Sequence, residues 1–136
     1  MTLDISSDVL AHVRRAASGA AGLEVCGLLF GDDLRIETAQ ACANVAEDPR
    51  RSFEIDPAHL LAAHRAARTG GAKIVGHYHS HPSGSATPSA RDAAAAAGDG
   101  AIWLIIAGAD VRAWRAVEGG SVHGSFEPVA YRRASS

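Results

Sequence analysis

The chain has 136 residues, of which 47% are hydrophobic and 21% are charged. This composition is typical of a globular protein with enough chain for a buried core, so we expect a single domain over residues 1–136, its core at about 6–131. The formal net charge of −2 argues against a general binder of the nucleic-acid backbone, because such domains are usually basic.

Neither a signal peptide nor a membrane span is predicted. The first ten residues lack a basic start and an apolar run, and no apolar stretch has the length that a bilayer requires. Cys26 and Cys42 are interpreted as small buried hydrophobic residues and not as a disulfide scaffold. We therefore expect a cytoplasmic protein of bacterial type, without a membrane partner.

Helices and strands are interleaved along the chain. We expect helices from a cap at Ser6 or Ser7 to Gly19, from Asp56-Pro57 to about Arg68, and from Ser89 through the alanine run 93–97. The expected strands are 26–30, 34–41, 53–55, 73–79, 102–107, 111–117 and 125–131, separated by a polar loop at 44–51 and a turn at Gly119-Gly120, with a frayed end at 134–136. This order predicts an α/β fold in which helices pack on a mixed sheet.

The segment His79-Ser80-His81-Pro82 contains a pair of potential metal ligands. In an extended strand the two imidazoles lie on the same side, and the strand should stop at Pro82, which cannot donate to a sheet ladder. Two surface histidines are the simpler interpretation of this pair alone. Asp92 adds a third ligand, and three protein ligands that leave a position for water are typical of a catalytic zinc site.

Two neighbouring features allow alternative interpretations. Ser89-x-x-Asp92 matches a helix capping box, and this role is compatible with metal binding because the helix start would fix the direction of Asp92. His77 would share a face with His79 and could complete a closed, structural set of four ligands. We favour a neighbouring role for His77, outside the ligand set.

The pattern of Glu24 before Cys26-Gly27, then His79-Ser80-His81-Pro82, then Ser89-x-x-Asp92 resembles the JAMM motif of the JAB/MPN (Mov34/MPN/PAD-1) zinc metalloproteases. The resemblance extends over residues 6–117. It implies a cytidine-deaminase-like mixed β-sheet sandwiched by helices, and cleavage of peptide or isopeptide bonds beside ubiquitin-like proteins. No element of the catalytic motif is missing.

The resemblance also implies a role for each motif residue. His79, His81 and Asp92 would bind one catalytic Zn²⁺, which lowers the pKa of a bound water to about 7. Glu24 would take a proton from this water and later give one to the leaving amine. Ser89 would donate a hydrogen bond to the developing oxyanion, a contribution of about 3 kcal/mol in comparable sites.

The short spacing between Asp92 and the strand at 102 leaves no room for the insertion with which deubiquitinating relatives grip ubiquitin. The chain therefore resembles the small stand-alone bacterial members, and the expected substrate is a ubiquitin-like or sulfur-carrier protein, cut after its C-terminal Gly-Gly. The oligomeric state is not predicted from the sequence.

Three other functions are possible. A non-catalytic MPN-type module that binds ubiquitin-like proteins is the main alternative, but the complete motif argues against it. A zinc nucleoside deaminase would need H-x-E and P-C-x-x-C, which Cys26 and Cys42 cannot supply. A role in DNA repair, with which some relatives are associated, is disfavoured by the weak net charge, so no nucleic-acid partner is expected.

Overall fold

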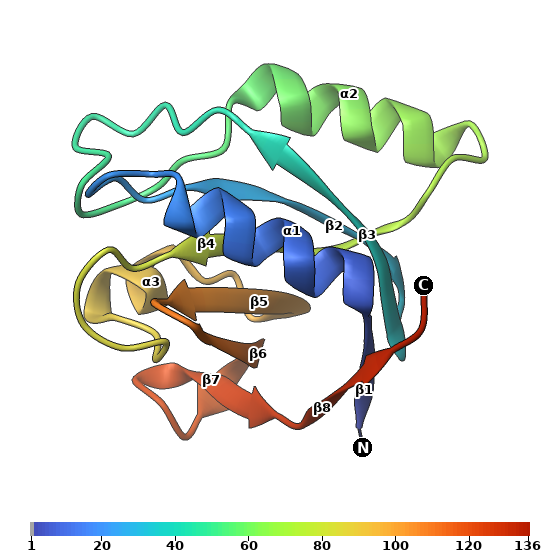
Figure 1. Ribbon diagram of the computed structural model, residues 1–136. Helices are drawn as coiled ribbons and strands as arrows, with labels where there is room; N and C mark the ends of the chain where they lie inside the picture. Colours follow the sequence, from blue (N-terminus) through green and yellow to red (C-terminus); the bar gives the residue numbers. More distant parts are fainter. Residues whose placement is uncertain (1) are drawn as a thin grey trace.

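The computed structural model describes residues 2–136 and contains one curled sheet with helices on both faces (Figure 1). The helices are α1 (Ser7–Ser18), α2 (Pro57–Arg68) and α3 (Ala90–Ala95). The strands are β1 (Leu3–Ser6), β2 (Cys26–Asp32), β3 (Arg35–Cys42), β4 (Ile74–Ser80), β5 (Asp99–Ala107), β6 (Asp110–Gly120), β7 (Gly124–Val129) and β8 (Tyr131–Ala134). The expected α/β class is confirmed.

The sheet has the order β7-β6-β5-β4-β2-β3-β1-β8 and is mixed. The pairs β4–β5, β1–β3 and β1–β8 are parallel, and the remaining neighbours are antiparallel. The chain passes from β7 at one end of this order to β8 at the other with only Ala130 between them, so the sheet curls until its two ends are joined by consecutive residues (Figure 1).

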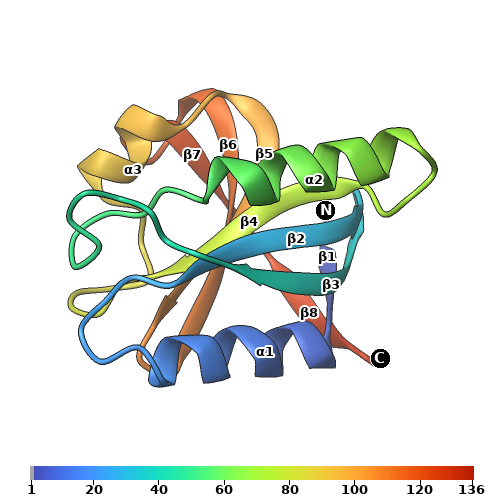
Figure 2. The same cartoon turned by 90° about the horizontal axis from the view of Figure 1, so that it is seen from above.

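Helix α1 lies on one face of the sheet and α2 and α3 lie on the other (Figure 2). The buried face of α1 presents Val9, Leu10 and Val13 to a core that includes apolar residues of most of the strands. On the opposite face, α2 covers a cluster on β2 that includes Cys26 and Leu28. The expected packing of helices on both sides of a mixed sheet is therefore confirmed.

Local capping signals account for the helix boundaries. The hydroxyl of Ser6 accepts from the amide of Asp8, and Gly19 follows the end of α1. The carboxylate of Asp56 accepts from the amide of Ala58, and Pro57 is the first residue of α2. These caps satisfy amides that have no partner within the helix. No helix within residues 2–136 is both long and apolar enough to span a membrane.

Five sequence predictions were wrong in detail. Residues 53–55 form no strand: the side chain of Asn44 occupies the amide of Glu54 and the carbonyl of Ser52, and Ile55 makes only an isolated bridge with Asn44. The third helix ends at Ala95 and not at 97.

The other three errors lie near the end of the chain. The single strand expected at 125–131 is divided at Ala130 into β7, which pairs with β6, and β8, which pairs with β1. Gly119 and Gly120 belong to β6, and the chain reverses just beyond them, where His123 and Gly124 have positive φ angles of 52° and 69°. Residues 134–136 are not frayed, because β8 pairs with β1 and the hydroxyl of Ser136 accepts from the amide of Asp8 at 2.9 Å.

Candidate metal centre

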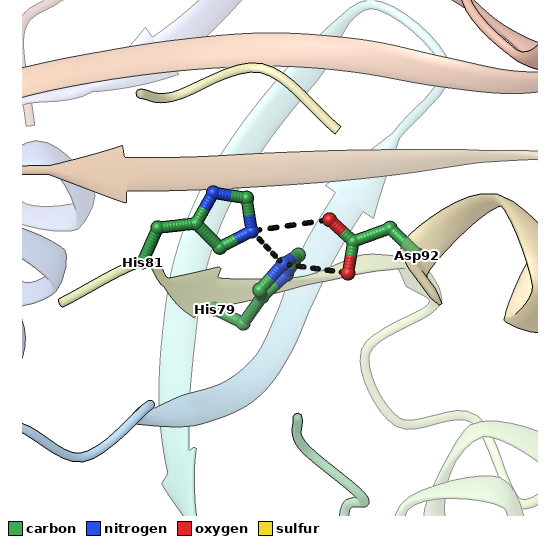
Figure 3. Close-up of side chains that lie close together, drawn as sticks. All are labelled: His79, His81 and Asp92. Atoms are coloured by element: carbon green, nitrogen blue, oxygen red, sulfur yellow. Dashed lines mark hydrogen bonds and ion pairs between the residues drawn. The ribbon is translucent and has the colours of Figure 1, made fainter. Parts of the chain in front are cut away.

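The three candidate ligands come from two elements at the carboxyl end of the central strand β4. His79 lies within β4, where it pairs with Cys26 of β2 and Ile105 of β5. His81 follows the end of the strand, before Pro82. Asp92 is the third residue of α3 and reaches the two histidines from the opposite side (Figure 3).

The ligand atoms of these side chains converge. The Nε2 atoms of His79 and His81 are 3.1 Å apart. Asp92 places Oδ1 at 3.2 Å from the first and Oδ2 at 3.1 Å from the second (Figure 3). Across residues 2–136, no other group of three His, Cys, Asp or Glu side chains offers ligand atoms as close together. His77 is not part of this group, so a set of four protein ligands is not formed.

The hydrogen bonding of His81 favours a metal-binding role of this cluster over a purely structural one. The Nδ1–H of His81 donates to the carbonyl oxygen of Ser85 at 2.7 Å, which leaves the Nε2 lone pair directed at the cluster in the neutral ring. In the metal-free protein the contacts of these Nε2 atoms with Asp92 need protons on the nitrogens, and a cation bound between the three side chains would take the place of those protons. Ligands about 2.0–2.1 Å from a tetrahedral Zn²⁺ lie roughly 3.3 Å apart, which is close to the separations observed here.

Burial and neighbouring side chains shift the pKa values of all three residues of the cluster. Burial lowers the pKa of His79. Burial also acts to lower the pKa of His81, but its hydrogen bonds to Asp92 and Ser85 and the nearby negative charges leave it raised. Burial opposes ionisation of Asp92, but hydrogen bonds from both histidines hold its pKa well below the usual range. Asp92 is therefore an anionic candidate ligand at neutral pH.

Aromatic rings support the imidazole of His79. Phe53 stacks on this imidazole with the ring centroids 4.3 Å apart and the planes 20° apart, while Trp103 meets it edge-on at 5.8 Å. His77 packs against Trp103 at 4.3 Å, and burial lowers its pKa to about 3. These rings restrict the orientation of His79. Phe53, His77 and Trp103 also form part of the wall of a cavity of about 530 Å³ between α2 and the sheet.

Glu24 lies just before β2 and is 7% exposed. Its Oε1 atom is buried without a hydrogen-bond partner. Burial raises the pKa of this carboxyl to about 7, with smaller and partly opposing effects of the charges on His81 and Asp92. A carboxyl group that titrates near neutral pH beside a ligand cluster is suited to accepting and returning a proton.

Ser89 caps α3, as the sequence predicted. Its Oγ accepts from the amide of Asp92 at 3.0 Å, and Oδ2 of Asp92 accepts from the amide of Ser89 at 2.9 Å. This capping box fixes the side chain of Asp92 toward the histidines. Since the Ser89 oxygen acts here as an acceptor, its hydroxyl proton is not used by the cap.

Several supporting residues could not be identified from spacing. Ser85 contributes a backbone carbonyl, which carries no residue-type signal, and Phe53 comes from a distant loop. Asn44 lies within the span of the family resemblance, but residue type and spacing do not indicate the contacts that its side-chain amide makes.

A family model described as prokaryotic homologs of the JAB domain matches residues 6–117. A desampylase from Haloferax volcanii is 39% identical over 107 residues, which is 77% of this chain and 77% of the relative. A desampylase from Pyrococcus furiosus is 32% identical over 105 residues, covering 77% of this chain and 74% of the relative.

Solved structures share the fold. A protein from Desulfitobacterium hafniense has a TM-score of 0.82 at 24% identity, over 99% of this chain and 94% of the other. A protein from Salinibacter ruber has a TM-score of 0.68 at 27% identity, over 97% and 92%. A JAB1/MPN domain protein from Archaeoglobus fulgidus has a TM-score of 0.60 at 20% identity, over 96% and 98%.

Proposed function

Because this chain belongs to the family of prokaryotic homologs of the JAB domain, we propose that it is a zinc-dependent peptidase or isopeptidase that cuts after the C-terminal Gly-Gly of a ubiquitin-like or sulfur-carrier protein. The chain is a hydrolytic enzyme, as are its desampylase relatives. Those relatives act on conjugates of a ubiquitin-like protein. Their similarity over 77% of this chain supports a substrate of the same class.

In this proposal His79, His81 and Asp92 hold the metal. A zinc ion bound there would lower the pKa of a water ligand to about 7 and polarise the scissile carbonyl. The contribution of the chain is a rigid ligand set: Ser85 sets the tautomer of His81, Phe53 stacks on His79, and the cap of α3 directs Asp92. Such supporting contacts orient metal ligands and tune their basicity.

Glu24 is proposed as the general base and acid. Its carboxylate would take a proton from the attacking water and deliver one to the amine that leaves when the amide bond breaks. A pKa of about 7 suits both steps, because at neutral pH the group is populated in both protonation states. Its unpartnered oxygen remains available for this proton.

Ser89 is proposed to stabilise the oxyanion. Its oxygen is fixed by the amide of Asp92 at 3.0 Å, while its hydroxyl proton can turn toward the carbonyl oxygen that becomes negative in the transition state. Removal of one such donor typically costs about 2.7–4 kcal/mol of transition-state stabilisation.

One observation gives the proposal its strongest support. The buried carboxyl group of Glu24, whose pKa is about 7, lies beside a convergent set of two histidines and an aspartate. The test is an intact-mass assay of zinc-loaded protein with ubiquitin-like carriers extended beyond Gly-Gly. Chelated protein and Glu24→Gln serve as controls, and we expect loss of the extension only in the zinc-loaded wild type. Full activity of Glu24→Gln would refute the mechanism, and binding without cleavage would favour the non-catalytic module.

A further inference from the structure

The position of Glu24 depends on its backbone. The Oε1 atom of its carboxylate has no hydrogen-bond partner, and the residue lies outside any strand, two positions before β2 begins. No hydrogen bond therefore holds the side chain in place at that atom. The contacts that hold the main chain of residues 24 and 25 therefore determine where the carboxylate lies relative to His79, His81 and Asp92.

Two residues besides Pro49 hold the main chain of this segment. Ser80 of β4 accepts from the amide of Val25 through its Oγ at 2.9 Å and donates its own amide to the carbonyl oxygen of Val25 at 3.1 Å, while the side chain of Asn44 contacts Glu24 itself. Its Nδ2 donates to the carbonyl oxygen of Glu24 at 3.0 Å and to that of Ser52 at 3.1 Å. Its Oδ1 accepts from the amides of Ala46 and Glu54, both at 3.0 Å. A side-chain amide has two donor hydrogens and two acceptor lone pairs, so every hydrogen-bonding position of Asn44 is in use.

Three of these bonds fold residues 44–54 into a loop, here called the strap, that contacts both halves of the site. In the middle of the strap the carbonyl of Pro49 accepts from the amide of Glu24 at 2.8 Å. Near its end Phe53 stacks on the imidazole of His79. Glu24 is thus held by the strap through its amide and through its carbonyl oxygen, and only the second bond uses a side chain.

We propose that Asn44 is a positioning residue that sets the distance between Glu24 and the three candidate ligands through the strap. The inference rests on the proposed function, because it assigns Asn44 a role in the proton transfer by Glu24. The hydrogen bonds of the Asn44 side chain go to Glu24, Ala46, Ser52 and Glu54 and not to the three candidate ligands. Its loss should therefore lower the rate of the chemical step and leave metal binding and substrate binding intact.

The substitution Asn44→Asp tests this role. It is nearly isosteric and keeps both acceptor positions for Ala46 and Glu54, so most of the strap's contacts stay, but it removes the donors to Glu24 and Ser52. Ser52→Ala is the matched control: it removes a hydroxyl that donates to the carbonyl of Asp48 at 3.1 Å in the same loop and leaves the Asn44 contacts in place. Should Asn44→Asp fail to fold, Asn44→Ser carries the same test without an added charge.

With a Gly-Gly-extended carrier as substrate, we expect kcat of Asn44→Asp to fall about 10- to 100-fold, as for small misplacements of reacting groups. KM should stay within about twofold, because uniform binding is untouched, and the zinc content should equal that of wild type. Ser52→Ala should retain wild-type kcat. A wild-type kcat in Asn44→Asp, or a loss accompanied by loss of zinc, would overturn the inference.

A second measurement uses the Glu24→Gln background under single-turnover conditions with excess enzyme. Since no base remains to be positioned, adding Asn44→Asp should not lower the residual rate further. An additional loss as large as that in wild type would also contradict the inference. An active Glu24→Gln single variant would instead contradict the proposed function itself, so the two failures are distinguishable.

Discussion

Replacing Glu24 by Gln should stabilise the metal-free protein at alkaline pH. The carboxyl is 7% exposed, and burial raises its pKa from 4.5 to about 7. Between these two pH values the folded state binds more protons than the unfolded state. The free energy of unfolding of the wild type therefore falls as the pH rises through this window, and Gln, which cannot ionise, avoids the loss.

The magnitude follows from the two pKa values. Each pH unit of difference corresponds to about 1.4 kcal/mol, so ionising Glu24 in the folded protein costs up to about 3 kcal/mol relative to the unfolded chain. We expect the stability advantage of Glu24→Gln to be close to zero below pH 4.5, to grow between pH 5 and 7, and to level off above pH 7.

Urea unfolding at a series of pH values between 4 and 9 measures this advantage. A chelator must be present, because a bound cation would favour the carboxylate form. Glu47→Gln, in the exposed part of the loop, controls for the loss of a carboxylate as such. An advantage that is constant across the pH range, or is shared by Glu47→Gln, would show that Glu24 ionises normally and that its burial has no electrostatic cost.

Three further predictions concern the metal and the core. Zinc should raise the melting temperature of the wild type but not of Asp92→Asn in scanning fluorimetry, because the variant loses the anionic ligand; an equal rise in both would remove Asp92 from the site. Gly27→Ala should destabilise the fold by roughly 1–3 kcal/mol in urea unfolding, because the added carbon would lie 2.3 Å from the ring of Tyr78 and from the carbonyl of Gln40, and wild-type stability would contradict this. Cys26 should resist alkylation at pH 8 until the chain is unfolded, since burial raises the pKa of its thiol to about 12; rapid labelling of the native protein, read by mass spectrometry, would be inconsistent with that burial.

The elements that the sequence predicted well are those with local signals. Both long helices begin at a side-chain cap and end close to a glycine, and these interactions lie within a few positions of one another. The apolar runs at 26–30 and 102–107 indicated strands, but the pairing of β4 with β2 and β5 was not predicted. At the candidate site, the convergence of His79 and Asp92 depends on a capping box that the motif Ser89-x-x-Asp92 indicates.

What the sequence missed depends on contacts between distant segments. β1 has four residues, and its partners β3 and β8 lie about thirty and about 130 positions away, so no local period indicates a strand. The strand expected at 53–55 does not form, because the amide of Glu54 donates to the side chain of Asn44 and not to a neighbouring strand. The direct opposition of Cys26 and Cys42 across β2 and β3 likewise depends on register, which spacing does not reveal.

The parallel pair β1–β8 has a consequence for folding during synthesis. It joins Leu3 to Tyr131, so one side of β1 has no partner until Tyr131 has left the ribosome. The segments that carry Glu24, His79 and Asp92 emerge earlier, and β2, which follows Glu24, pairs with β4, which carries His79. Because closing so long a loop is slow, we expect the ligand cluster to form before the two ends of the sheet meet, and the nascent chain to bind zinc before it resists proteolysis at its first strand.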